Sequence, residues 1–236
     1  MIKNTILLCT FNESQYIEET IINLDKYIPD LEVIIVDDNS SDNTVEIIKN
    51  LKIKSKLVLI ERKKLKGLAS AFERALIEST GENVGWIDTN MGELAEKFPQ
   101  MISDLNDNDL ILLSRYVKGA SDKRVFIRVF CSKLINLFCR IVLGGKIRDY
   151  TSSIFIMKRS VLNETKIMPY GHGDFFIEFL FLVSKQSYKI KEIPYVQKKD
   201  DIEASTNTSP NLFRFFFLGF LYAVRVIVTR LRNFNL

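Results

Sequence analysis

The fold is decided by the stretch Val33-Ile34-Ile35-Val36-Asp37-Asp38-Asn39-Ser40-Ser41-Asp42-Asn43-Thr44. Its first four residues are β-branched and include no polar residue, which is typical of a parallel strand covered on both faces. The residues at 41–43 can cap a helix that continues to Leu51. The stretch therefore predicts a strand, a turn that carries two adjacent carboxylates, and a helix.

Similar units flank this stretch on both sides. Short apolar runs alternate with segments whose apolar residues follow a helical period, and this order predicts an α/β fold with a doubly wound, mostly parallel sheet. A later strand is expected at 192–197, where Pro194 indicates an edge of the sheet. The other expected strands are 5–9, 33–36, 57–60, 83–87 and 110–113, and the expected helices are 14–27, 41–51 and 68–79.

Polar clusters follow three of the predicted strands, at 10–13, 37–39 and 88–90. Ligands of such sheets bind beyond the carboxyl ends of the strands, so the three clusters predict one shared binding site. The chain has neither a G-x-G-x-x-G motif after its first strand nor a Walker loop. This argues against a dinucleotide-binding or P-loop protein.

The acidic residues in these clusters indicate the chemistry of the site. Asp37 and Asp38 can accept hydrogen bonds from a nucleobase or a ribose, although the pair also suits a turn that caps a helix. An Asp-x-Asp pair after a strand can hold a divalent cation that neutralises a departing diphosphate. Here the pair is Asp88-Thr89-Asn90, so a cation would depend on Asp88, aided by Glu93; the alternative is an ordinary strand-end turn.

Two features of the second half bear on catalysis. The sole histidine, His172, is interpreted as structural. Asp174 and Glu178 lie one turn apart on a predicted helix, and an acceptor with a hydroxyl group would need such a carboxylate as general base.

The excess positive charge is concentrated at the C-terminus. The net charge is +4, and residues 210–236 contain four arginines and no acid among apolar side chains. This pattern favours an anionic membrane surface over nucleic acid as the partner. Segment 123–142 is also amphipathic, and it is predicted to be either a core helix or a second membrane contact.

Residues 207–236 are predicted to form an interfacial helix that lies on the membrane. Arg214 and Arg225 have only ten residues between them, fewer than the about 20 that span a bilayer. Arg232 falls within about 20° of both on a helical wheel, so the three arginines share one face. A tilted insertion with snorkelling arginines and a dimer-forming helix are the alternatives.

The cysteine pattern and the N-terminus indicate the compartment. The three cysteines show no metal-ligand spacing and are odd in number, which is typical of reduced thiols in a cytosolic protein. The first residues do not resemble a secretory signal. We therefore expect the chain at the cytoplasmic face of a membrane, as a peripheral or monotopic protein.

These motifs resemble the family 2 glycosyltransferases of the GT-A fold, and specifically the dolichyl- or polyprenyl-phosphate sugar synthases. The resemblance covers about residues 3–206, which would form the glycosyltransferase domain, followed by the tail at 207–236. Five blocks carry it in the family's order: 10–13, 36–44, Arg62 with 67–71, 114–119 and 149–152.

The resemblance implies roles for individual residues. A divalent cation, Mg²⁺ or Mn²⁺, would be held by Asp88 and Asn90, and Arg115 would lie against a phosphate of the donor or acceptor. The donor would be bound by Phe11, Glu13, Ile35, Asp37, Asp38, Arg62 and Asn90, and the acceptor phosphate by Ser152, Lys198 and Lys199.

The chain departs from the family pattern at several positions. Asn90 replaces the second metal-binding aspartate, and Lys198 or Lys199 stands for a phosphate-binding arginine. A lysine supplies charge but lacks the bidentate fork of arginine. The other departures are Cys9 for proline, Ser153 and Phe155 for glycine and arginine, and Thr206 for lysine.

The predicted function is an inverting transfer of a hexose from a nucleotide-diphosphate sugar, GDP-mannose or a UDP-hexose, to a polyprenyl or dolichyl phosphate. Such an acceptor is mostly ionised at neutral pH, because its second pKa is ~6, and it needs no protein base. One alternative is a glycan hydroxyl acceptor with Asp174 as the base. Another, motivated by Asn90 and Thr206, is a catalytically impaired protein that binds nucleotide sugars.

Overall fold

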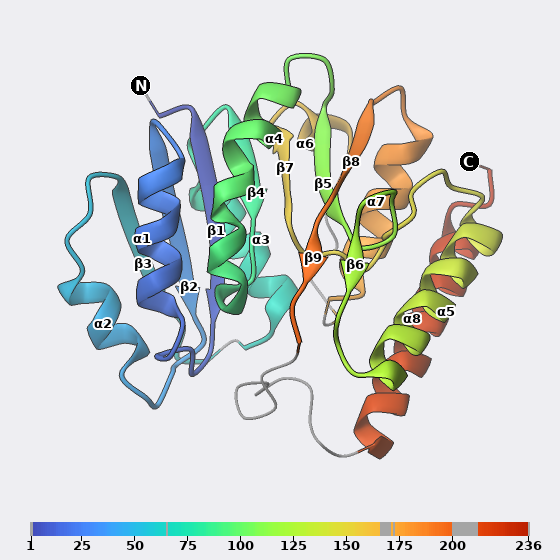
Figure 1. Ribbon diagram of the computed structural model, residues 1–236, viewed down its shortest axis with the longest axis horizontal. Helices are drawn as coiled ribbons and strands as arrows, with labels where there is room; N and C mark the ends of the chain where they lie inside the picture. The colour runs from blue at the N-terminus through green and yellow to red at the C-terminus, as the bar shows by residue number, and fades with distance from the viewer. Residues whose placement is uncertain (1, 65, 166–170, 172, 200–211, 236) are drawn as a thin grey trace.

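A single seven-stranded sheet organises the chain (Figure 1). The computed structural model describes residues 2–64, 66–165, 171, 173–199 and 212–235. All strands of the sheet are parallel except β7, which runs antiparallel between β4 and β5. In spatial order they are β3 (Lys56–Glu61), β2 (Leu31–Asp37), β1 (Asn4–Thr10), β4 (Asn83–Trp86), β7 (Phe155–Lys158), β5 (Leu110–Ser114) and β8 (Ile190–Pro194).

Helices cover both faces of this sheet, which confirms the predicted doubly wound α/β class. One core lies under α1 (Ile17–Tyr27), the short η1 (Thr89–Lys97) and α4 (Phe98–Asp104). The other lies under α3 (Leu68–Glu78) and α7 (Phe175–Lys185). Alternate residues of β2 enter opposite cores and all seven are buried, as the apolar run predicts.

The remaining elements are short or lie at the margins. A two-residue ribbon joins β6 (Ser121–Asp122) to β9 (Val196–Gln197) in parallel. The short helices are α2 (Thr44–Asn50) and α6 (Val161–Glu164). Strand β8 pairs only with β5, so Pro194 does lie at an edge, as predicted. Strand β7 was not predicted, because three apolar residues followed by a lysine give no clear period.

Helices α5 (Phe126–Leu143) and α8 (Leu212–Arg232) pack side by side beyond β8 (right in Figure 1). Only three residues of α5 are buried, and two of them, Cys139 and Leu143, belong to the core under α3 and α7, so segment 123–142 contacts the core along one face and leaves another face exposed. No helix in the described parts of the chain is long and apolar enough to cross a membrane. The apolar side chains that α5 exposes are Phe126, Ile127, Phe130, Leu134, Leu137 and Ile141.

Candidate active site

A cleft of about 570 Å³ opens beyond the carboxyl ends of the central strands. It is lined by residues from the ends of β1, β4 and β5 and by residues near α5, β9 and α8. The predicted site residues that line it are Glu13, Asp88, Asn90, Arg115, Ser152, Lys198 and Lys199. The parallel sheet thus brings together residues that lie up to 186 positions apart in the chain.

The paired aspartates hold the loops beside this cleft rather than line it. Asp37 is fully buried and accepts hydrogen bonds from the Thr10 hydroxyl at 2.9 Å and the Ser40 amide at 2.8 Å. Asp38 forms an ion pair with Arg62 and accepts the Gly67 amide at 2.7 Å. The two carboxylates therefore fix the turns before α2 and α3.

The other predicted donor residues take different positions. Ile35 is fully buried in the core under α1, away from the lining of the cleft. Phe11 is exposed beside the site, with the Lys66 ammonium 5.1 Å from its ring centre. Its face is thus available for stacking on a base, whereas Ile35 supports the strand from beneath.

Glu13 is the acidic group of the cleft whose ionisation the fold disfavours. Burial, followed by the charges of Asp88 and Asp42, raises its pKa to about 7. A cation bound nearby would favour the ionised carboxylate. The thiol of Cys9, in the same wall, also has a raised pKa, chiefly because of burial and then because of Asp38, so it stays protonated at neutral pH.

Asp88 is the residue best placed to hold a divalent cation. It follows β4, lines the cleft with Asn90 and Glu93, and accepts a short hydrogen bond from the Ser153 hydroxyl. Within the described residues, no group of three or more His, Cys, Asp or Glu could hold a metal ion. The set fits Mg²⁺ or Mn²⁺ nonetheless, because such ions are commonly held by one or two carboxylates together with substrate phosphates.

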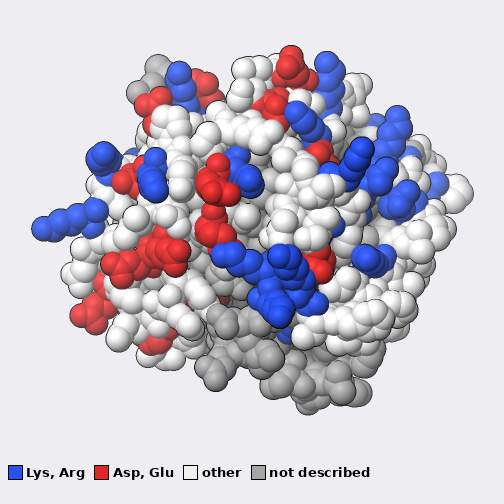
Figure 2. Space-filling model, viewed as in Figure 1, with Lys and Arg blue, Asp and Glu red and all other residues white. Residues whose placement is uncertain are grey.

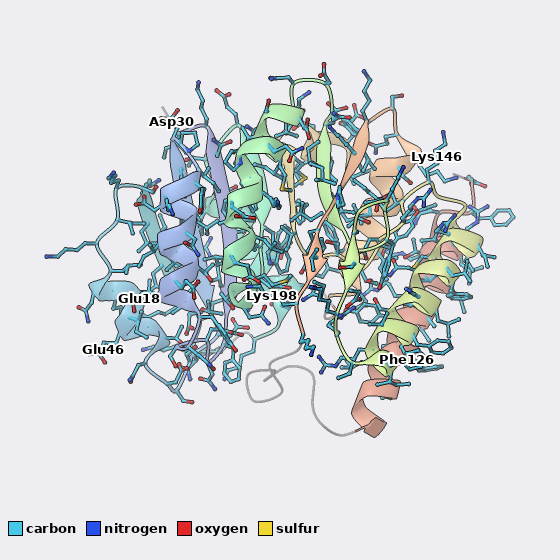
Figure 3. All side chains as sticks on the ribbon, viewed as in Figure 1. Glu18, Asp30, Glu46, Phe126, Lys146 and Lys198 are labelled. Atoms are coloured by element: carbon cyan, nitrogen blue, oxygen red, sulfur yellow. The ribbon has the colours of Figure 1, made fainter. Side chains whose placement is uncertain are left out.

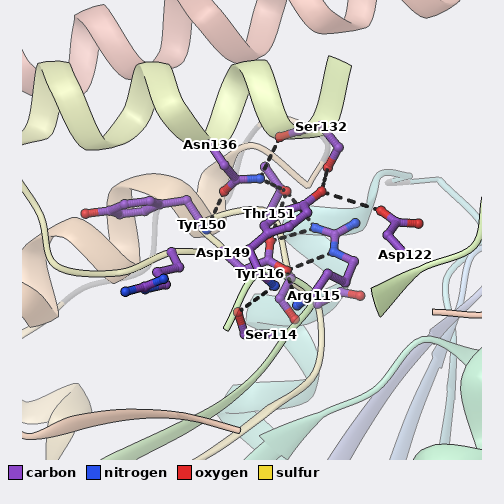
Figure 4. Close-up of polar contacts among 12 residues, drawn as sticks. Ser114, Arg115, Tyr116, Asp122, Ser132, Asn136, Asp149, Tyr150 and Thr151 are labelled. Carbon is purple, nitrogen blue, oxygen red and sulfur yellow. Dashed lines mark hydrogen bonds and ion pairs between the residues drawn. The ribbon is translucent and has the colours of Figure 1, made fainter. Parts of the chain in front are cut away.

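Arg115 directly follows β5 and is held in the cleft by a buried network of hydrogen bonds (Figure 4). Its guanidinium donates to both carboxylate oxygens of Asp149, at 2.8 and 2.7 Å, and to the Thr151 hydroxyl at 2.8 Å. Asn136 of α5 donates to the same hydroxyl and accepts the Tyr150 amide. Burial acts to lower the pKa of Arg115, but the charge of Asp149, its hydrogen bonds and the nearby Tyr195 and Tyr116 together raise that pKa well above its usual value.

Two further basic residues line the cleft and were not predicted as site residues. Arg124 and Arg128 stand at the start of α5, and Arg124 is held by Asp122 through contacts of 2.9 and 2.6 Å. Lys198 also lines the cleft, and its ammonium lies 3.1 Å from the carboxylate of Glu93. Figure 2 shows basic side chains gathered where Figure 3 labels Lys198. The signal for the arginines was their position on the polar face of segment 123–142.

Asp174 lies outside the lining of the cleft. Its carboxylate is held 2.8 Å from Arg225 of α8, and Glu178 lies 3.4 Å from the same guanidinium. Arg232 also reaches Glu178, at 3.5 Å. Two of the three arginines predicted to share one face of the helix thus point toward α7. The side chain of Arg214 and the position of His172 lie outside the described residues.

The sheet order, its single antiparallel strand and the cleft at the strand ends define a protein of the GT-A fold. Glucosyl-3-phosphoglycerate synthase from Mycobacterium tuberculosis, crystallised with Mn²⁺, UDP and phosphoglyceric acid, has this fold. It superposes with a TM-score of 0.71 at 16% identity, over 96% of this chain and 78% of that one. More narrowly, the chain belongs to glycosyl transferase family 2, whose sequence model matches residues 5–166.

Two curated relatives are similar over most of the chain. A dolichol-phosphate mannosyltransferase of Pyrococcus furiosus is 31% identical over 199 residues, which are 82% of this chain and 56% of that protein. A dodecaprenyl-phosphate galacturonate synthase of Rhizobium johnstonii is 25% identical over 174 residues, 71% of this chain and 51% of that protein. The chain therefore spans about half the length of these two relatives.

Proposed function

We propose that the protein transfers a hexose from a nucleotide-diphosphate sugar to a polyprenyl phosphate, with inversion at the anomeric carbon. The observation that carries this proposal is that the cleft combines acidic with basic side chains. Glu13 and Asp88 line it, and so do basic residues at 115, 124, 128, 198 and 199. Carboxylates suit a cation with a diphosphate, and basic side chains suit a second phosphate.

The donor occupies the side formed by β1 and β4. Phe11 stacks on the base, while Asp37 and Asp38 keep the surrounding loops in shape. Asp88 and Asn90 would hold a Mg²⁺ or Mn²⁺ ion beside the diphosphate. Such an ion supplies positive charge that stabilises the leaving group. The similarity to a mannosyltransferase makes GDP-mannose the first donor to test, with UDP-hexoses next.

The acceptor phosphate binds beside the basic residues of the cleft. One of its oxygens attacks the anomeric carbon, the bond from that carbon to the donor diphosphate breaks, and the nucleoside diphosphate leaves with the bonding electrons. The attacking oxygen is already ionised, so no proton has to be removed. The protein contributes alignment and positive charge, chiefly through Arg115, which Asp149 and Thr151 hold in one orientation.

The paired helices α5 and α8 place this chemistry at a membrane. Residues 123–148 and 210–236 contain no acid, and both helices expose large apolar side chains beside basic ones. An apolar face with positive flanks suits an anionic lipid surface. In this proposal residues 1–206 are the catalytic part, 207–236 are the membrane-contacting tail, and the protein sits at the cytoplasmic face.

A hydroxyl acceptor with Asp174 as general base receives less support. Asp174 is largely buried against Arg225, and the described lining of the cleft does not include it. A base has to come within hydrogen-bond reach of the proton that it removes. The phosphate acceptor is therefore the better candidate.

The test combines donor binding with transfer. GDP and UDP are titrated calorimetrically with and without Mn²⁺, and GDP-mannose, UDP-glucose and UDP-N-acetylglucosamine are then assayed with a polyprenyl phosphate. We expect Asp88→Asn to lower kcat by about a hundredfold, whereas Asp107→Asn on the exposed surface leaves it unchanged. Binding without transfer from any donor would favour a non-catalytic nucleotide-sugar-binding protein.

A further inference from the structure

A second hollow, of about 430 Å³, lies between α8 and the beginning of α7. Its walls are mainly apolar side chains of α8, from Leu218, Leu221, Val224 and Val228. Nothing in the proposed chemistry uses this hollow, although its volume is within the range of small-molecule sites.

The charged groups at the base of this hollow are paired with one another. Arg225 lies 2.8 Å from Asp174 and 3.4 Å from Glu178. Asp174 is the N-cap of α7, and Glu178 lies in the first turn of that helix. Arg232 lies 3.5 Å from Glu178. Because the ion pairs neutralise these charges internally, the hollow is suited to an apolar ligand and not to a second ionic one.

Tyr222 lies between the hollow and the cleft. It is the described residue that lines both, and its hydroxyl lies so close to Gly173 that a Cβ there would come within 2.7 Å of the oxygen. Gly173 itself lines the cleft. The aromatic ring therefore forms a shared wall, with phosphate-binding chemistry on one side and apolar surface on the other.

We propose that this hollow binds the first isoprene units of the acceptor's hydrocarbon chain, while the phosphate remains in the cleft. The proposal rests on the proposed function, because it assigns the second half of the same acceptor. The chain passes Tyr222, contacts the apolar side chains of α8, and leaves toward the exposed face that α8 shares with α5. Acceptor length is then recognised by α8, outside the segment 5–166 that the family model matches.

The test measures how affinity depends on chain length. Monophosphates with one, two and three isoprene units are titrated calorimetrically into the full chain in the presence of GDP or UDP, and the same compounds are assayed as acceptors. In the wild-type protein we expect affinity to rise about tenfold or more from one to three units, as apolar surface is buried. Leu221→Gln and Val224→Gln should flatten this dependence while leaving donor affinity unchanged.

Matched controls come from the same helix. Phe220→Gln and Ile227→Gln alter exposed apolar residues of α8 that do not line the hollow. They should retain the wild-type dependence on chain length, and thermal melting should show that all four variants fold. An unchanged dependence in the Leu221 and Val224 variants, or equal flattening in the controls, would overturn the proposal.

The two proposals fail in different ways. One outcome is that binding depends on chain length, the hollow variants abolish this dependence, and no transfer occurs. This would support lipid binding in the hollow and refute the proposed transferase activity. The other outcome is transfer from a nucleotide sugar with a chain-length dependence that the hollow variants leave intact, which would support the transferase activity and refute lipid binding in the hollow. Absence of both binding and transfer would refute the two together.

Discussion

Asn39 adopts a left-handed backbone conformation, with φ of 62°, in the turn that follows the two aspartates. Asparagine is one of the few residues besides glycine that enter this region readily. We predict that Asn39→Gly changes the free energy of unfolding by less than about 1 kcal/mol, and that Asn39→Ala lowers it by about 1–2 kcal/mol. Urea denaturation measures both. Equal stability of the two variants would show that the turn is not strained.

Glu13 gives a pH-dependent prediction. Its pKa in the folded protein is about 7, raised from the usual value of 4.5 mainly by burial. Between these values the unfolded chain releases a proton that the folded one retains, so stability falls as pH rises and the cost is complete above about 7. In a metal-free buffer Glu13→Gln should raise Tm at pH 8 by about 2–5 °C and leave it unchanged near pH 4. An equal change at both pH values would contradict this ionisation.

The sequence predicted the strand-end location of the site but not which carboxylates reach the ligand. Asp37, Asp38 and Asp88 all follow strands, yet only Asp88 lines the cleft. The difference depends on Thr10 and Arg62, which lie far from the aspartates in sequence and occupy the first two carboxylates. Spacing within one motif contains no information about such partners.

At the scale of elements, the packing of α8 against its neighbours α5 and α7 has the largest consequence. The helical period placed Arg225 and Arg232 on one face, and both do reach Glu178. The period could not show that this face meets α7, because periodicity describes one helix and not its neighbour. The face left for a membrane is therefore the apolar one.

The ion pair between α8 and α7 should contribute to stability in a way that a double-mutant cycle detects. Arg225→Met leaves Asp174 buried without this partner, which we expect to cost about 3 kcal/mol. Adding Asp174→Asn removes the buried charge and should recover a large part of that loss. Denaturant unfolding of the wild type, both single variants and the double variant gives the coupling. Additive losses would show that the two side chains do not interact.

The exposed face of α5 predicts binding to vesicles. Replacing both Phe126 and Phe130 by glutamine should weaken association with anionic vesicles by about tenfold, because two large apolar side chains no longer enter the interface. Ile77→Gln, an equally exposed apolar position on α3, is the control and should have no effect. Co-sedimentation at several salt concentrations measures this. A similar loss from the Ile77 variant would indicate that the binding is non-specific.

At the scale of the whole molecule, the sheet and the helix pair have separate tasks. The sheet ends supply Asp88 and Glu13, while α5 and the segment after β9 supply Arg128 and Lys198. These residues are far apart in sequence and line the same cleft, so the combination of charges on which the proposed reaction depends is a property of the tertiary fold. The buried network around Asp149 joins them, since it links α5 to Arg115.

Two acceptors with the same hydrocarbon chain test the phosphate-acceptor mechanism most directly. A polyprenyl phosphate and the corresponding polyprenol are incubated with the full chain, Mn²⁺ and a radiolabelled nucleotide sugar that the protein binds, and the lipid product is quantified. The protein should glycosylate the phosphate and leave the alcohol unmodified, because Asp174, the base predicted for a hydroxyl acceptor, is paired with Arg225 outside the described lining of the cleft. Comparable transfer to the alcohol, or release of free sugar alone with both acceptors, would contradict the mechanism.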